Sequence, residues 1–132
     1  MKELCPLDYR YGREDMKSIF YDDSRLQYQM DVESALARAH ASLGAIAKED
    51  ADEISRIANL ETVRPERVKE IEKETRHDVM AMIKAMTEQC RGDAGKYVHL
   101  GATSNDIVDT ATALQIKAAL DIIDEDVDAL IY

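Results

Sequence analysis

Two polar clusters in this sequence hold residue types that bind anions and move protons. The first is Arg76-His77-Asp78, a cation, an imidazole and a carboxylate placed where one predicted helix ends and the next begins. The second comprises His99, Thr103 and Ser104, and it opens another predicted helix. The amides and positive dipole end of a helix N-terminus favour negatively charged ligands. Together the clusters predict one site for a phosphate or carboxylate.

Helix capping is a simpler explanation of the same residues. Thr75 can cap the helix that follows, and Asp78 suits the positive end of that helix. A hydroxyl side chain at a helix start is also common, so the second cluster is a weak signal when taken alone. On the functional interpretation, Arg76 and His77 donate to the anion, while Asp78 fixes a tautomer or orients a neighbour.

The remaining candidates give weaker signals. Arg10 and Tyr11 offer a guanidinium and a phenol from an irregular segment, residues 1–12, although each alone is more typical of a surface anchor. His40 lies on the inner face of a long predicted helix and is expected to be a core histidine. The His and Cys spacings do not fit a zinc site, and no phosphate-binding glycine loop or nucleophile elbow occurs. We therefore expect neither a metal nor a cofactor.

Composition favours a helical chain. The 132 residues are enough for one modest domain or part of a larger one, and 45% are hydrophobic, as in globular proteins. Only 5 Gly and 2 Pro occur, too few turn residues for a β-sandwich or barrel. The abundant Ala, Leu, Glu, Ile, Lys and Met residues favour helix. The predicted fold class is all-α.

Charge and cysteine content bear on partners and location. The net charge of −10 argues against nucleic acid or an anionic membrane as a partner. The 2 cysteines, Cys5 and Cys90, form no C-x-x-C motif, which favours reduced thiols in a cytoplasmic protein. The chain starts without an apolar leader and contains no long apolar run, so secretion and membrane spanning are disfavoured.

Hydrophobic periodicity predicts where the helices lie. They are expected over residues 13–20, 22–44, 48–58, 65–74, 77–90 and 104–132. In the second helix a capping residue is expected at Asp22, Asp23 or Ser24, and Gly44 ends the helix. The face of that helix comprises Leu26, Met30, Glu33, Leu36, Ala37, His40 and Leu43. The fifth helix buries Val79, Met82, Ile83 and Met86, and a flexible polar connection with Gly92 and Gly95 follows.

The last helix carries two opposed apolar stripes. At about 3.6 residues per turn, one stripe comprises Ile107, Ala111, Leu114, Ala118 and Ile122. The other comprises Ile116, Leu120, Ile123, Val127 and Leu130. A helix with two such stripes is expected between neighbours on both sides. The abrupt end at Tyr132 therefore predicts a bundle helix cut short, whose second stripe is covered by a partner chain or by further polypeptide.

Three segments resemble the adenylosuccinate lyase family of the fumarase/aspartase superfamily. They are residues 9–16 (YRYGREDM), 72–79 (EKETRHDV) and 98–111 (VHLGATSNDIVDTA). The third segment is also similar to cycloisomerases of that superfamily, whereas the second favours the purine enzyme. The resemblance covers nearly the whole chain and matches the N-terminal part of the family.

The resemblance implies a β-elimination that releases fumarate from adenylosuccinate, or from the succinyl-carboxamide ribotide of purine synthesis. It implies assisting catalytic roles for His77 and His99. The residues implied to bind substrate are Arg10, Tyr11, Arg76, His77, Asp78, Thr103 and Ser104. The family's principal acid, a histidine in a T-H-G segment, and its principal base, a serine on a mobile loop, do not occur in these residues. The 132-residue chain alone is therefore expected to be inactive.

The resemblance further implies domains at residues 1–104 and 105–132, the second being the start of a central bundle. It also implies a homotetramer with sites assembled from several subunits. Two alternatives stay open from the sequence. One is a helical interaction module without catalytic function, and the other is a related superfamily lyase or cycloisomerase.

Overall fold

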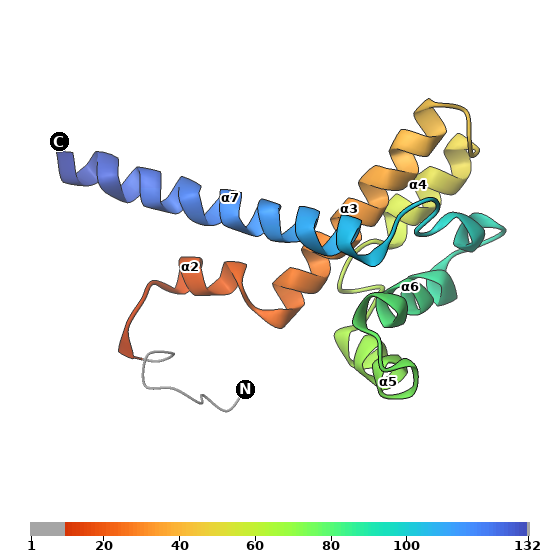
Figure 1. The fold of residues 1–132 in the computed structure, drawn as a ribbon, viewed down its shortest axis with the longest axis horizontal. Helices are drawn as coiled ribbons and strands as arrows, with labels where there is room; N and C mark the ends of the chain where they lie inside the picture. The colour runs from red at the N-terminus through yellow and green to blue at the C-terminus, as the bar shows by residue number, and fades with distance from the viewer. Residues whose placement is uncertain (1–9, 132) are drawn as a thin grey trace.

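The structure is a computed structural model that describes residues 10–131. All regular elements in that range are helices (Figure 1), so the predicted all-α class is confirmed. Cys5, Pro6, Tyr9 and Tyr132 lie outside the described residues. The irregular start is therefore tested only at residues 10–12. Tyr11 and Gly12 form a bend as expected, but Arg10 has helical backbone, so the prediction is wrong at that residue.

The helices match the predicted ranges closely. They are α2 (Glu14–Ile19), α3 (Asp22–Ser42), α4 (Lys48–Ile57), α5 (Pro65–Thr75), α6 (Asp78–Gln89), the 3₁₀ helix η1 (Ala94–Tyr97) and α7 (Ser104–Ile131). The prediction of a flexible connection around Gly95 is wrong, because this residue lies in η1. A Cβ added to Gly95 would lie 2.9 Å from Cγ2 of Thr87, so close packing against α6 explains the glycine.

The two ends of α3 test the predicted N-cap residue and the predicted glycine at the C-terminal end. Its N-cap is Tyr21, which makes no side-chain capping bond, so the predicted cap is wrong. Asp22 and Asp23 lie inside the first turn, where their charge favours the dipole. At the other end Gly44 has φ +72°. The amide of Ala45 donates to the carbonyl of His40 at 2.9 Å, which closes the expected glycine-terminated end.

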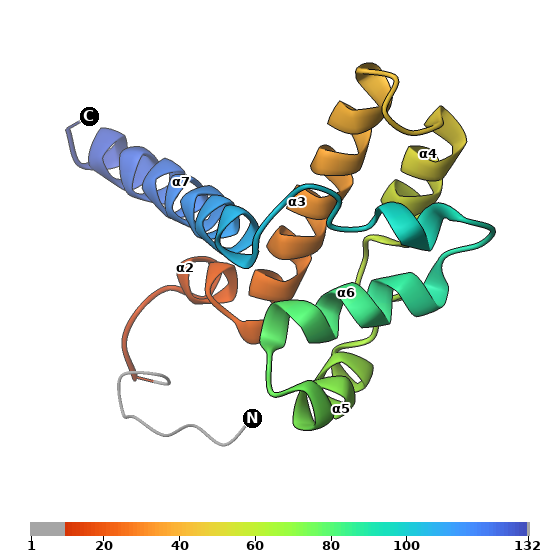
Figure 2. The same ribbon diagram turned by 45° about the vertical axis from the view of Figure 1, so that its right-hand side comes forward.

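Helix α3 is the central element of the fold. It packs against α4 on one side and α7 on the other, while α5 and α6 pack against each other (Figures 1 and 2). Large residues that are fully buried come from most of these helices: Met30, Ile54, Ile57, Met82, Met86 and Ile107. The predicted buried face of α6 is confirmed, with Ile83 partly buried at its margin.

Two residues expected on the inner face of α3 are not in the core. Leu43 is exposed, because it follows the last packed turn of the helix. His40 is only partly buried, so its prediction as a core histidine is wrong. Its ring contacts the loop before α7 instead of the interior. Glu33, in contrast, is 1% exposed.

The stripes of α7 are partly as predicted. Ile107 and Ala111 are buried, but Leu114 is exposed and Gln115 and Ala119 are buried in its place. Gln115 belongs to the interior because its amide donates to the carbonyl of Ile19 at 2.7 Å. The second stripe, Ile116, Leu120, Ile123, Val127 and Leu130, is exposed along its whole length. Nothing in the described part of the chain covers it.

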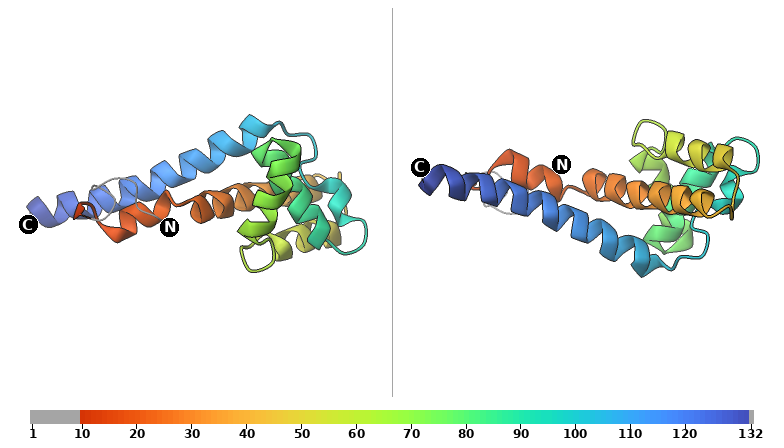
Figure 3. Two further views of the ribbon diagram at one scale, coloured as in Figure 1. Left: turned by 90° about the horizontal axis from the view of Figure 1, so that it is seen from below. Right: turned by 90° about the horizontal axis from the view of Figure 1, so that it is seen from above.

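Helix α7 gives the molecule its elongated shape. Its C-terminal half extends away from α4, α5 and α6, and of the described elements α2 lies beside it (Figure 3). An ion pair between Arg13 and Asp126 joins the two helices. None of the helices within residues 10–131 is long and apolar enough to cross a bilayer.

Candidate functional site

The first predicted cluster lies at the turn between α5 and α6. Helix α5 ends at Thr75, and Arg76 adopts a left-handed conformation with φ 53°. This reversal makes His77 the N-cap of α6, with extended backbone. The amide of Met80 donates to Nδ1 of His77 at 3.3 Å. The expectation that Thr75 caps this helix is wrong, since its hydroxyl instead donates to the carbonyl of His77 at 3.2 Å.

The capping bond determines which nitrogen of His77 can carry a proton. Nδ1 accepts from Met80, so the ring proton of the neutral imidazole lies on Nε2. The side chain is half-exposed, which leaves Nε2 accessible. Asp78 is too distant to fix this tautomer, because its Oδ1 lies 3.7 Å from Nδ1. It accepts instead from the amide of Val79 at 2.8 Å.

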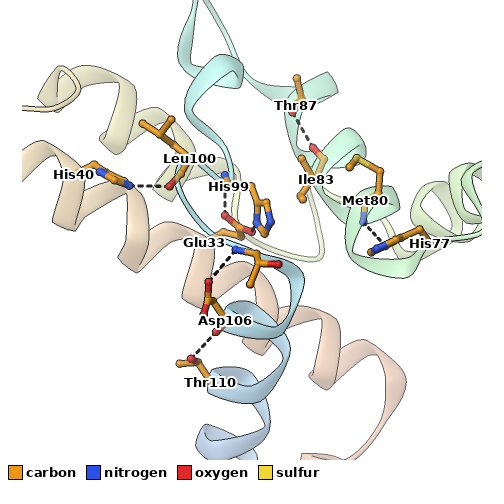
Figure 4. Close-up of polar contacts among 11 residues, drawn as sticks. Glu33, His40, His77, Met80, Ile83, Thr87, His99, Leu100, Asp106 and Thr110 are labelled. Carbon is orange, nitrogen blue, oxygen red and sulfur yellow. Dashed lines mark hydrogen bonds and ion pairs between the residues drawn. The ribbon is translucent and has the colours of Figure 1, made fainter.

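The second cluster is built around a hydrogen-bonded pair between the buried Glu33 of α3 and the partly buried His99 of the loop before α7. Nδ1 of His99 lies 2.6 Å from Oε1 of Glu33, and the His99 amide donates to Oε2 at 3.0 Å (Figure 4). Burial raises the pKa of the Glu33 carboxyl, and the hydrogen bonds from His99 offset part of that rise. Nε2 of His99 makes no hydrogen bond within residues 10–131, so this nitrogen is available to a ligand.

A second contact from α3 holds the same loop. Nε2 of His40 lies 2.8 Å from the carbonyl oxygen of Leu100 (Figure 4). A carbonyl only accepts, so Nε2 of His40 is the donor. Gly101 follows with φ +73°, and its backbone passes close to the His40 ring. Glu33 and His40 are seven positions apart, so they lie two turns apart on one face of α3.

The start of α7 leaves its hydroxyl side chains unused. The amide of Thr103 donates to Oδ2 of Asp106 at 2.9 Å, and the Asp106 amide donates to the Thr103 carbonyl at 3.0 Å. Asp106 thus supplies the carboxylate half of a capping box. The hydroxyls of Thr103 and Ser104 make no hydrogen bond within the described residues. Simple capping therefore does not account for them.

Each of the two clusters contains a residue with strained backbone. Among the described residues, the non-glycine residues with positive φ are Arg76, at 53°, and His99, at 66°. Such conformations cost on the order of 1–3 kcal/mol each and are enriched at functional sites. Arg76 directly precedes His77, the N-cap of α6, and His99 lies in the loop before α7. The strain is thus consistent with a positioned site.

Within one chain the structure brings only part of the predicted set together. His99 and Thr103 lie in the loop before α7, Ser104 is the first residue of that helix, and α6 contacts α7. His77 lies further along α6 in the view of Figure 4, and no hydrogen bond within residues 10–131 joins it to that loop. The segment that begins at Arg10 and Tyr11 lies at the opposite end of the long axis from α6 (Figures 1 and 3).

A surface pocket lies beside the first cluster. It has a volume of about 250 Å³ and lies between α5 and the first turns of α3 and α6. Its charged lining residues are Asp22, Asp23, Arg25, Lys69, Glu72 and Asp78. Asp78 is the member of the predicted site that reaches it. In residues 10–131 no group of three His, Cys, Asp or Glu side chains is arranged to hold a metal ion.

Sequence reasoning missed the residues that hold this site in place. The sequence pattern puts Glu33 on an apolar face and gives it no role, although a carboxylate in such a stripe signals a buried partner. The same pattern predicts His40 to be a core residue. The role of Asp106 was also missed, although it stands three residues after Thr103, the spacing of a capping box.

A family profile described as Lyase matches residues 8–132, and the chain belongs to this lyase family. It is 57% identical over 125 residues to an adenylosuccinate lyase of Pyrococcus abyssi, covering 95% of this chain and 28% of that protein. It is 53% identical over 120 residues to the adenylosuccinate lyase of Methanocaldococcus jannaschii, covering 91% and 26%. The resemblance read from the sequence is confirmed, and the chain spans about a quarter of the length of these relatives.

Solved structures give the same superfamily. The 3-carboxy-cis,cis-muconate lactonizing enzyme of Pseudomonas putida is 33% identical with a TM-score of 0.84, over 92% of this chain and 28% of that one. A fumarate lyase from Mesorhizobium sp. BNC1 is 35% identical with a TM-score of 0.76, over 89% and 29%.

Proposed function

We propose that this chain forms part of an adenylosuccinate lyase, which cleaves adenylosuccinate to AMP and fumarate. The same site would cleave the succinyl-carboxamide ribotide of purine synthesis to its carboxamide product and fumarate. The observation that carries the proposal is 57% identity over 95% of the chain to a relative of that name. The positive φ values of Arg76, which precedes His77, and of His99 add independent support.

Each candidate residue has a role that suits its position. Arg76 and His77 would donate to substrate oxygens beside α6, with Asp78 next to them. Thr103 and Ser104 would hold a succinyl carboxylate with their free hydroxyls at the start of α7. His99 would line the same site through Nε2. Arg10 and Tyr11 would contact the nucleotide phosphate, and their distant position suggests that they serve a site on another subunit.

The chemistry requires this kind of environment. Removal of a proton next to the succinyl carboxylate produces a doubly charged aci-carboxylate, which fixed donors stabilise. The C–N bond then breaks, and the departing amine nitrogen needs a proton from a positioned acid. Hydroxyls and amides at the start of α7 suit the first demand. Imidazoles suit the second, so His77 and His99 are assigned assisting roles.

We further propose that the complete protein is a homotetramer in the cytoplasm. Residues 1–104 would form the N-terminal domain, and residues 105–132 would begin a central helical bundle. The exposed second stripe of α7 supports this arrangement, because a large exposed apolar patch marks a surface that binds another protein. No cofactor is needed for the proposed elimination.

One competing activity has a specific observation in its favour. The high TM-score to a muconate lactonizing enzyme fits a cycloisomerase equally well at the level of fold. The greater sequence identity to adenylosuccinate lyases favours the elimination. A helical module without activity is the other alternative, and it predicts no turnover at all.

The polypeptide encoded by the complete reading frame that contains residues 1–132 provides the test. It should be incubated separately with adenylosuccinate, the succinyl-carboxamide ribotide and 3-carboxy-cis,cis-muconate. We expect equimolar fumarate and AMP from the first substrate, and no lactone from the third. Lactone formation would assign the cycloisomerase, and no product from any substrate would favour the module.

A further inference from the structure

We propose that Glu33 is a positioning residue of this site, which holds the His99 ring so that Nδ1 donates to the carboxylate and Nε2 faces the substrate. This inference rests on the proposed lyase function for its catalytic meaning. The orientation of the ring comes from the coordinates, and the position of its proton follows from the Glu33 carboxylate acting as the acceptor. Glu33 itself would not touch the substrate.

The geometry of the pair is that of a fixed support. The two oxygens of one carboxylate bind two donors of one residue, Nδ1 at 2.6 Å and the backbone amide at 3.0 Å. The Glu33 side chain is fully buried, while the ring of His99 retains 16% exposure. A carboxylate removed from water needs such partners, because an unpaired one would be costly. The ring is therefore constrained and still reachable.

The backbone of the loop shows why such a support is needed. His99 has φ 66°, a conformation that non-glycine residues adopt rarely. The hydrogen bond from the His99 amide to Oε2 of Glu33 holds His99 in that conformation. Two turns further along the same face of α3, His40 donates to the carbonyl of Leu100 at 2.8 Å. Helix α3 thus fixes the loop at two successive residues.

The chemical consequence concerns the ring tautomer. An ionised carboxylate accepts only, so Nδ1 must carry the proton that it shares with Glu33. In the neutral ring Nε2 then has the lone pair, and in the protonated ring Nε2 carries the second proton. A carboxylate plays the same part toward histidine in Ser-His-Asp triads, where it sets tautomer and orientation. Glu33 would therefore decide whether Nε2 of His99 can exchange a proton with the substrate.

The Glu33→Gln variant of the complete polypeptide tests this directly. A glutamine side chain keeps the shape but offers one acceptor oxygen in place of two, so one of the two His99 donors must lose its partner. When the glutamine NH₂ group faces Nδ1, Nδ1 must accept and the ring proton moves to Nε2. We expect kcat to fall about 100-fold or more, with KM changed much less, as for wrong-tautomer variants. Ser34→Ala is the matched control, since Ser34 is buried on the same helix and binds Ser55 at 2.9 Å.

A second measurement keeps the inference testable if the variant fails to fold. In the wild-type protein labelled with ¹⁵N-histidine, the His99 signals, assigned by their loss in His99→Gln, should show a proton on Nδ1. A proton found only on Nε2 would overturn the proposal, as would a folded Glu33→Gln enzyme with the kcat of wild type. Absence of lyase turnover in the wild type would refute the proposed function instead, and would leave the NMR result to decide the orientation.

Discussion

The imidazole of His77 combines a structural and a chemical task on separate nitrogens. Nδ1 accepts from the Met80 amide and closes the first turn of α6. Nε2 is left for a ligand, on a side chain that is half-exposed. Loss of the cap and loss of the proton donor would both follow from removal of the ring. The two losses can be separated, because a side chain without an imidazole can still cap the helix.

His77→Asn and His77→Ala are expected to differ in stability but not in activity. Asparagine is a preferred N-cap, so it should preserve the free energy of unfolding, whereas alanine should cost about 1 kcal/mol. Both variants lack the imidazole and should lose roughly 10²–10⁴-fold in kcat for adenylosuccinate. Urea denaturation and a fumarate assay of the complete polypeptide measure the two effects. An asparagine variant with full activity would exclude a chemical role for His77.

At this scale the sequence allowed prediction of the polar clusters but not of their supports. Arg76, His77 and His99 were identifiable because charged and imidazole groups beside helix starts are informative in themselves. Glu33 was not, because its partner is 66 residues away and only the fold brings them together. The left-handed conformations of Arg76 and His99 also left no sequence signal, since neither residue is glycine.

The helices themselves could be predicted well because apolar periodicity and proline or glycine boundaries are local signals. Pro65 begins α5, and Gly44 follows the end of α3, as expected. The prediction failed at η1, where glycine was interpreted as a source of flexibility. Gly95 is needed there because Thr87 of α6 occupies the space that a side chain would take. The packing of η1 against α6, which no local sequence signal reveals, therefore explains why residue 95 is glycine.

Gly95→Ala is therefore expected to destabilise the fold by about 1–3 kcal/mol through overpacking. The closest atom to the new methyl group is Cγ2 of Thr87, at 2.9 Å. Thr87→Ser removes that atom, so Gly95→Ala should be neutral or slightly stabilising in the serine background, because alanine restricts the unfolded chain. Unfolding free energies of the four proteins form the test. An equal loss in both backgrounds would show that this contact is not the cause.

The shape of the whole molecule leaves two features incomplete. The second stripe of α7 is exposed, with Leu120 at 57%. The segment before α2 lies far from α6 along the long axis (Figure 3). Association of subunits through α7 would cover the stripe and could bring the first segment of one subunit to the histidines of another. The exposed stripe was predictable from its spacing, but the separation of the segment before α2 from α6 required coordinates.

Leu120→Glu is expected to weaken that association, because it places a charge in the middle of the stripe. Lys117→Glu is the matched control, since Lys117 is exposed on α7 but outside the stripe, and its charge changes by more. Sedimentation velocity of the complete polypeptide should show smaller species for the leucine variant and wild-type assembly for the control. Unchanged assembly in both would place the subunit interface elsewhere.

The most direct measurement is an experimental structure of the complete polypeptide with AMP and fumarate bound. We expect His77, the Nε2 atom of His99 and the hydroxyl of Ser104 within hydrogen-bond distance of one ligand pair, with Arg10 of a neighbouring subunit at the phosphate. Ligand bound elsewhere, or these side chains facing separate regions of solvent in the assembled protein, would contradict a shared anion site.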